Sequence, residues 1–141
     1  MERSTYFVKL FKPQFAELVS RGEKRQTVRP TPKRMPQVGD DISLRAWSGK
    51  PYRSKQRLLA EGLITQVVTI TITETAVLLR PTQKLTVHVP REKFAADDGF
   101  SSWEAMRDWF KEAHGLPFDG ILISWEIVNS DERVLLASLG I

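Results

Sequence analysis

The fold is decided by a β-branched run near the middle of the chain, Val67-Val68-Thr69-Ile70-Thr71-Ile72-Thr73. Isoleucine and threonine alternate in it, which places apolar and hydroxyl side chains on opposite faces of a strand. Valine, isoleucine and threonine dominate residues 63–79, the strongest strand signal in the 141-residue chain. Residues 63–79 are therefore predicted to be strand.

Towards the N-terminus, the pattern predicts one short helix between strands. Phe15, Leu18 and Val19 have the i, i+3, i+4 spacing of a helix with one buried face, and Gly22 suits a left-handed C-terminal cap. These features predict a helix over 13–21. Strands are predicted at 6–11, 26–29 and 42–47, with a proline-containing extended loop at 30–36.

Towards the C-terminus, strands are predicted at 84–89 and 120–128. Between them, Ser101 followed by Glu104 has the spacing of a capping box and opens a second helix. Gly115 is expected to end that helix.

Together these elements amount to about six strands and two or three short helices, without regular βαβ alternation. The excess of strands predicts a mainly β, α+β fold, in the form of a small β-barrel flanked by helices. The length fits a single domain over residues 1–141, with its core at about 6–129. Residues 130–141 are expected to form a short helix or a C-terminal tail.

The composition narrows the classes of function. The chain contains no cysteine and only two histidines, His88 and His114. Disulfides, thiol nucleophiles, iron–sulfur clusters and cysteine-based zinc sites are excluded, and we expect no metal and no cofactor. Residues 1–11 lack the pattern of a signal peptide, and no apolar run of about 18 residues occurs. We therefore expect a cytoplasmic protein that does not span a membrane, either a monomer or a dimer.

Positive charge is concentrated in one third of the chain. Between Arg21 and Arg57, eleven lysines and arginines outnumber three acids, so this segment carries +8 while the remainder carries −4. Such a basic segment is typical of proteins that bind phosphate-bearing partners. The alternative is a solvated surface with no partner.

The most polar part of this segment is a predicted surface loop over 47–57, which combines aromatic and basic side chains. Aromatic rings stack on bases and cations contact phosphates in proteins that bind single-stranded RNA. The candidate stacking residues are Trp47 and Tyr52, and the candidate phosphate contacts are Lys50, Arg53 and Lys55. In the alternative, Trp47 at a strand end belongs to the core.

Four blocks of sequence occur in an order that identifies a family resemblance. They are Gly22-Glu23-Lys24-Arg25-Gln26-Thr27-Val28-Arg29, Val38-Gly39-Asp40-Asp41-Ile42, Asp97-Asp98-Gly99-Phe100-Ser101-Ser102-Trp103-Glu104 and Ile123-Ser124-Trp125-Glu126-Ile127. Over about residues 6–129 the chain resembles the ASCH domain, the family named for homology to an activating signal cointegrator. The resemblance implies a β-barrel related to the PUA fold and a pocket suited to RNA or nucleobases.

The resemblance also implies a set of site residues. Family members that hydrolyse the amide of N4-acetylcytidine use a lysine and a threonine of the Gly-x-Lys-x-x-Thr block and a carboxylate before the second helix. The matching positions are Lys24, Thr27 and Asp98, although the family carboxylate is usually glutamate. Asp97 is a second candidate for the carboxylate.

These residue types form a coherent hydrolytic site. A desolvated lysine among other cations, here Arg25 and Arg29, loses its proton more easily and can then accept one from the Thr27 hydroxyl or from water. A carboxylic acid such as Asp98 can protonate the leaving amine, and Arg29 can stabilise oxyanion charge. In the alternative, Lys24 and Arg29 only bind phosphate, and Thr27 fills a strand position.

Geometry sets one condition on this site. Lys24 and Thr27 are three residues apart, so in one strand they would face opposite sides. They converge only if Lys24 lies in the turn that Gly22 makes before the strand. Ser102 is a further candidate for contacting the substrate near Asp98.

Three functions follow from this reading. The first is hydrolysis of N4-acetylcytidine through the Lys24 site. The second is binding or metal-independent cleavage of single-stranded RNA through loop 47–57. The third is recognition of a modified base without catalysis. Trp109 is predicted to be a core residue, and His114 a cation at a helix C-terminus.

Overall fold

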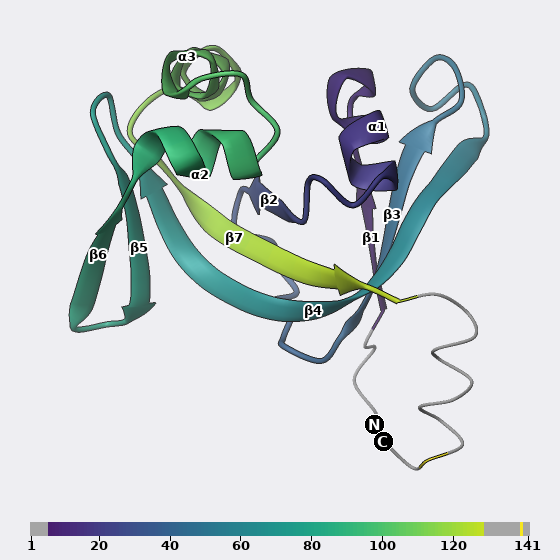
Figure 1. Cartoon of the computed structure of the whole chain (residues 1–141), viewed down its shortest axis with the longest axis horizontal. Coiled ribbons are helices and arrows are strands. Elements are labelled where there is room, and N and C mark those ends of the chain that lie inside the picture. Colours follow the sequence, from purple (N-terminus) through teal and green to yellow (C-terminus); the bar gives the residue numbers. More distant parts are fainter. Residues whose placement is uncertain (1–5, 129–138, 140–141) are drawn as a thin grey trace.

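The computed structural model describes residues 6–128 and Leu139, and the described residues form seven strands and three helices. In chain order the elements are β1 (Tyr6–Leu10), α1 (Pro13–Ser20), β2 (Gln26–Arg29), β3 (Asp41–Trp47), β4 (Gln56–Ile72), β5 (Val77–Thr82), β6 (Leu85–Val89), α2 (Arg91–Asp97), α3 (Trp103–His114) and β7 (Phe118–Ile127) (Figure 1). No helix in these described ranges has the length and hydrophobicity to cross a membrane.

The strand β4 is the centre of the sheet. Its first half pairs with β3, its second half pairs with β5, and β7 runs antiparallel to it along most of its 17 residues. The parallel strand β1 extends the sheet beyond β3, β6 pairs with β5, and β2 pairs with the outer side of β7. The mainly β, α+β prediction is confirmed. The pairings among the described strands leave the sheet open, so the predicted barrel is not confirmed.

Two strands differ from the sequence prediction. The decisive run 67–73 belongs to β4, but this strand begins at Gln56, inside the predicted loop 47–57. Residues 63–79 do not form one strand. The Thr73 hydroxyl accepts hydrogen bonds from the backbone of Thr75 and Ala76 and closes a turn before β5.

Two helices also differ from the prediction. The seven-residue helix α2 was not predicted because it buries only Phe94 and Ala95, too few residues to reveal a helical period. The predicted Ser101 cap of α3 is wrong. Ser102 is the N-cap, and its hydroxyl accepts from the backbone N–H of Ala105 at 3.0 Å. The predicted C-terminal tail over 130–141 lies outside the described residues, apart from Leu139.

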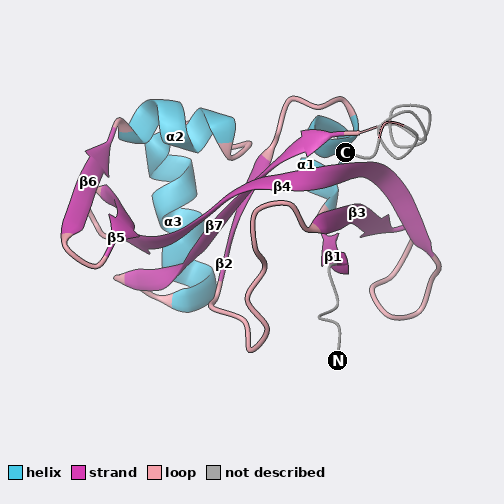
Figure 2. Ribbon diagram, turned by 90° about the horizontal axis from the view of Figure 1, so that it is seen from below, coloured by secondary structure: helices cyan, strands magenta, loops and turns pink. Residues whose placement is uncertain are grey.

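The helices divide the interior into two hydrophobic clusters. In Figure 1 the helix α1 stands beside β1 and β3, whereas α2 and α3 stand over the end of the sheet that β5 and β7 form. Figure 2 shows the same division from below, with α1 separated from α3 by the long strands. One cluster gathers around α1 and β3, the other around α3 and the end of β4, and Phe100 packs against both.

Candidate functional site

Lys24 is placed by the way helix α1 ends. Gly22 has φ +75°, and the N–H groups of Gly22 and Glu23 donate to the carbonyls of Val19 and Leu18, at 3.1 and 2.9 Å. This is the double hydrogen-bond pattern of a helix that ends on a left-handed glycine. Lys24 therefore lies in the turn before β2, and the condition for its convergence with Thr27 is met.

Asp98 is placed by the same device at the end of α2. Gly99 has φ +94°, and the N–H groups of Gly99 and Phe100 donate to the carbonyls of Ala96 and Ala95, at 3.0 and 2.9 Å. Asp98 is the C-cap residue. Two glycine-terminated helices thus bring Lys24 and Asp98 together from positions 74 residues apart.

Lys24 and Asp98 make direct contact in the interior. The Lys24 ammonium donates to the backbone carbonyl of Asp98, and its Nζ lies 3.4 Å from Oδ1 of the Asp98 carboxylate. The residues are 2% and 3% exposed. Gln26 Nε2 donates to the same Oδ1 at 3.2 Å, a contact that the sequence did not predict. The carbonyls at a helix end lack partners within the helix, and Lys24 satisfies one of them.

Burial moves the pKa values of this pair towards each other. Desolvation lowers the pKa of Lys24, and Arg29 lowers it further, while Asp98 opposes both effects. Desolvation raises the pKa of Asp98, against the opposing influence of Lys24 and Gln26. Arg25, which the sequence placed beside Lys24, is instead exposed, and its Nε donates to the carbonyl of Gly22 at 2.9 Å. The cation that crowds Lys24 is therefore Arg29.

Thr27 and Arg29 share one face of β2 and are linked. Arg29 Nε donates to Thr27 Oγ1 at 2.9 Å, and Arg29 Nη2 donates to the carbonyl of Leu10 at 2.9 Å. Thr27 is 4% exposed. Burial lowers the pKa of Arg29, yet a guanidinium keeps its charge in proteins. The Thr27 oxygen thus lies against a permanent positive charge.

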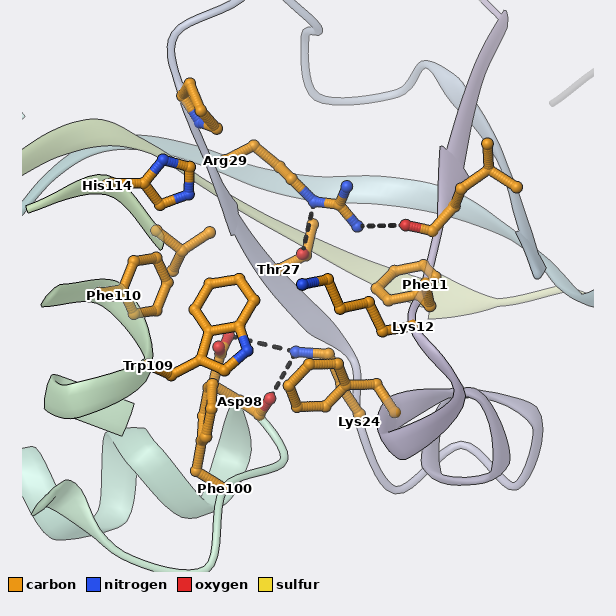
Figure 3. A pocket seen from close by; sticks show the side chains of 14 residues that line it. Phe11, Lys12, Lys24, Thr27, Arg29, Asp98, Phe100, Trp109, Phe110 and His114 are labelled. Carbon is orange, nitrogen blue, oxygen red and sulfur yellow. Dashed lines mark hydrogen bonds and ion pairs between the residues drawn. The ribbon is translucent and has the colours of Figure 1, made fainter. Parts of the chain in front are cut away.

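Lys24, Thr27, Arg29 and Asp98 line a single cavity of about 210 Å³ (Figure 3). Five aromatic rings form its apolar walls, from Phe11, Phe15, Phe100, Trp109 and Phe110. The Lys24 ammonium lies 5.0 Å from the centre of the Phe15 ring. This volume is below the roughly 300–1,000 Å³ of pockets for drug-sized ligands, so the cavity suits a small molecule.

Three further lining residues were missed by the sequence reading. Trp109 is partly buried and packs against the hydrophobic cluster around α3, and it also forms a wall of the pocket; the exposed His114 lines the pocket too. Lys12 precedes α1, and its Nζ lies 5.1 Å from the centre of the Trp109 ring. The sequence does contain a hint of this role for Trp109. Met106 and Phe110 already form the buried face of α3, so a further apolar residue beside them is available to line a pocket.

The remaining predicted residues lie outside this pocket. Ser102 is occupied as the cap of α3, and Asp97 pairs with Lys93 at 2.8 Å on the surface. None of the residues 47–57 lines the pocket, although Lys50, Arg53 and Lys55 are exposed as expected. Trp47 is only partly buried, and its ring centre lies 5.2 Å from that of Tyr52, which is 87% exposed with φ 63°. The sequence candidates therefore separate into a buried pocket and an exposed loop.

The described residues contain no group of three or more histidine, aspartate or glutamate side chains placed to hold a metal ion. No protein-family model, curated protein or solved structure matches this chain. The chemistry of the pocket and the four sequence blocks are therefore the features of this chain that bear on its function.

Proposed function

We propose that the protein is an amidohydrolase that removes the acetyl group from N4-acetylcytidine or a closely related acylated nucleoside. The observation that carries the proposal is the buried contact between Lys24 and Asp98 in a pocket that Thr27 also lines. These are the three positions that the ASCH resemblance selects. The proposed fold is correspondingly a variant of the PUA-like type.

The pKa directions suit this chemistry. A lysine whose pKa is lowered is a competent base, and a carboxyl whose pKa is raised is a competent acid. Transfer of one proton from Lys24 to Asp98 produces both neutral forms at once. The neutral pair is the form that burial favours, because desolvation penalises the charged form of each group.

The proposed reaction has two steps. Neutral Lys24 accepts the hydroxyl proton of Thr27 as the Thr27 oxygen bonds to the acetyl carbon, and Asp98 protonates the N4 amine as the carbon–nitrogen bond breaks. Cytidine leaves, and the acetyl group remains as an ester on Thr27. In the second step the Asp98 carboxylate takes a proton from water as the water oxygen bonds to the acetyl carbon. The Lys24 ammonium returns its proton to the Thr27 oxygen as the ester bond breaks, and acetic acid is released. Arg29, which lines the pocket, stabilises the acetyl carbonyl oxygen, on which negative charge develops as the Thr27 oxygen adds.

The pocket walls suit the base. Aromatic rings surround the cavity, and a pyrimidine presents a flat π-face to such rings. Asp98 reaches the pocket although it is one methylene shorter than glutamate, because it stands at the very end of α2. This placement supports Asp98 in the role that glutamate has in the family.

The test is incubation of the pure protein with N4-acetylcytidine and chromatographic detection of cytidine and acetate. Turnover is expected in the wild type, and a loss of at least about 100-fold is expected in Lys24→Ala. The control is Lys93→Ala, which removes a lysine that pairs with Asp97 on the surface. Absence of turnover in the wild type, or full turnover in Lys24→Ala, would contradict the proposal. Saturable binding without product would instead indicate recognition of a modified base.

One observation favours a second function, binding or cleavage of single-stranded RNA by loop 47–57. The Tyr52 ring is held out in solvent by a left-handed backbone and is flanked by exposed cations. In that case Lys50→Ala and Lys55→Ala weaken RNA binding as much as Lys24→Ala does, and the affinity falls steeply with salt. An affinity that does not vary with salt excludes it.

A further inference from the structure

Three cations, Arg34, Lys9 and Arg29, lie along strand β1, and Arg29 also lines the pocket. Arg34 Nη2 donates to the carbonyl of Tyr6 at 2.8 Å, where the strand begins, and Arg29 Nη2 donates to the carbonyl of Leu10, where it ends. Lys9 lies between these two points. Among the described strands β1 pairs only with β3, so its outer edge receives both guanidinium groups.

Lys9 is the unusual member of this row. It is partly buried and shares the inner face of the chain with Phe7 and Phe11, two residues away on either side. Arg34 stacks over the Phe7 ring at 3.9 Å, and Arg29 stacks over the Phe11 ring at 5.0 Å. The Lys9 ammonium is therefore flanked by two guanidinium groups.

Lys9 itself contacts no counter-charge among the residues that the structure describes. The structure records no hydrogen bond or ion pair for its side chain among the described residues, and burial, Arg29 and Arg34 all lower its pKa. Like charges that are partly desolvated together repel each other, whereas an ordinary surface lysine extends its ammonium into water. A bound anion would relieve this repulsion.

The pocket itself shows the same excess of positive charge. Among the described residues that line it, Lys12, Lys24 and Arg29 are cations, and Asp98 supplies the one carboxylate. Lys24 is committed to Asp98, but the only contact recorded for the Lys12 ammonium among the described residues is the face of Trp109. Arg29 uses two of its five N–H groups for Thr27 and Leu10, so three remain for a ligand.

We infer that the ligand of this pocket carries a phosphate ester, which Lys9, Arg29 and Lys12 bind where β1 meets the pocket. The base lies among the aromatic rings, and the phosphate lies outside them on the cations. The inference rests on the proposed function for the nucleoside part, but its phosphate part stands on separate residues. The phosphate belongs either to a free nucleotide or to an RNA strand, since both present the same ester.

The test measures binding and needs no turnover. The full-length protein is titrated with cytidine, with its 5′- and 3′-monophosphates and with a short oligocytidylate. A phosphate is expected to lower Kd by about tenfold or more, the effect of one charge-assisted contact. A further tightening with the oligonucleotide identifies an RNA strand, and equal affinity for mononucleotide and oligonucleotide identifies a free nucleotide.

Two variants locate the contact. Lys9→Met keeps the apolar stem of the side chain, and Lys12→Met changes an exposed residue, so folding is not at issue in the second. Each is expected to reduce the preference for the phosphorylated ligand about tenfold. For the oligonucleotide, each should also make the negative slope of log K against log salt shallower by about 0.7. The control Lys84→Met removes an exposed lysine between β5 and β6 and leaves the preference unchanged.

Several outcomes would overturn the inference. They are equal affinity for cytidine and its monophosphates, an unchanged preference in both Lys9→Met and Lys12→Met, an equal effect of Lys84→Met, or no binding of any of these ligands. The failure of the proposed function looks different. A phosphate preference without hydrolysis of N4-acetylcytidine retains the phosphate site and removes the amidohydrolase, and hydrolysis without a phosphate preference does the reverse.

Discussion

Lys24 and Asp98 are buried, where an isolated charge is unfavourable. Each compensates the charge of the other at 3.4 Å. Replacing both members of a buried ion pair by neutral residues is often harmless to folding, whereas removing one member leaves an uncompensated group. Stability alone therefore does not explain the pair. The proton-transfer role that we propose does account for it, because burial lowers the pKa of Lys24 and raises the pKa of Asp98.

The variant Lys24→Met makes stability depend on pH in a defined direction. It removes a group that lowers the pKa of Asp98, and burial then holds the folded-state pKa well above the ordinary 3.8. A raised folded-state pKa gives stability that is complete below the unfolded-state pKa and lost as pH rises through the folded-state pKa. Urea unfolding of Lys24→Met between pH 4 and about 8 should show the free energy of unfolding falling by about 3 kcal/mol relative to the wild type.

The double variant Lys24→Met/Asp98→Asn is the control for this prediction. With no ionisable group left at either position, the double variant should be more stable at neutral pH than Lys24→Met, because no unpaired charge remains buried. The rise in pH should not produce the loss seen in Lys24→Met. If the single and double variants have the same pH profile, Asp98 does not titrate as we infer.

At the scale of elements, the glycines that end α1 and α2 position Lys24 and Asp98. Of the two described glycines at φ +94°, Gly99 has less space around it. A Cβ at Gly99 would lie 3.1 Å from Phe15 and 3.2 Å from the Lys24 side chain, whereas a Cβ at Gly39, also at φ +94°, would meet nothing within 4 Å. Gly39→Ala should cost about 1–2 kcal/mol for its backbone alone. Gly99→Ala should cost more and should also reduce turnover, because Lys24 must shift.

Thermal unfolding and nucleoside turnover of the two glycine variants check this prediction together. The matched φ values remove the backbone contribution from the comparison. If both variants lose the same stability and both keep their turnover, then Gly99 is needed only because glycine tolerates a positive φ. The space that it leaves for the Lys24 side chain would then not matter.

The cap of α3 gives a second prediction at this scale. Ser102→Ala removes the hydroxyl that accepts from Ala105 and should destabilise the protein by about 1 kcal/mol. Ser101→Ala, one position earlier, should change the free energy of unfolding by less than about 0.5 kcal/mol. Chemical denaturation of both variants decides which serine caps the helix, and the reverse order would restore the capping box that the sequence suggested.

The elements also show what the sequence made predictable. Signals confined to a few residues were read correctly, such as the helix that Gly22 ends and the alternating strand around Ile70. The position of Lys24 in a turn before β2 followed from Gly22 alone. Features that depend on contacts with residues far away in the sequence could not be predicted. The helix α2 is short and little buried, and Ser101 and Ser102 compete for one cap within the same motif.

At the scale of the whole molecule, the pocket lies between the two hydrophobic clusters. Phe11 and Phe15 reach it from the cluster around α1, and Phe110 reaches it from the cluster around α3. These residues are up to 99 positions apart, between 11 and 110 in the sequence, and no local pattern connects them. No local pattern connects Lys9 with Arg34 either. They lie close together because the loop after β2 returns to β1. Sequence motifs identified the chemical groups, but the walls and the cation row required the tertiary structure.

Phe100 joins the two clusters and should therefore couple stability to binding. Its ring packs edge to face against Phe15 at 5.1 Å and against Trp109 at 5.9 Å, and both of these residues line the pocket. Met106 is fully buried in the α3 cluster and does not line the pocket.

Phe100→Ala and Met106→Ala should each lower the free energy of unfolding by about 2–4 kcal/mol. Only Phe100→Ala should also weaken the binding of cytidine 5′-monophosphate, because it removes a wall of the pocket in which we propose the base binds. Calorimetric titration at a temperature where both variants are folded measures the difference. Equal weakening in both would mean that binding follows global stability, and that the junction between the clusters does not shape the pocket.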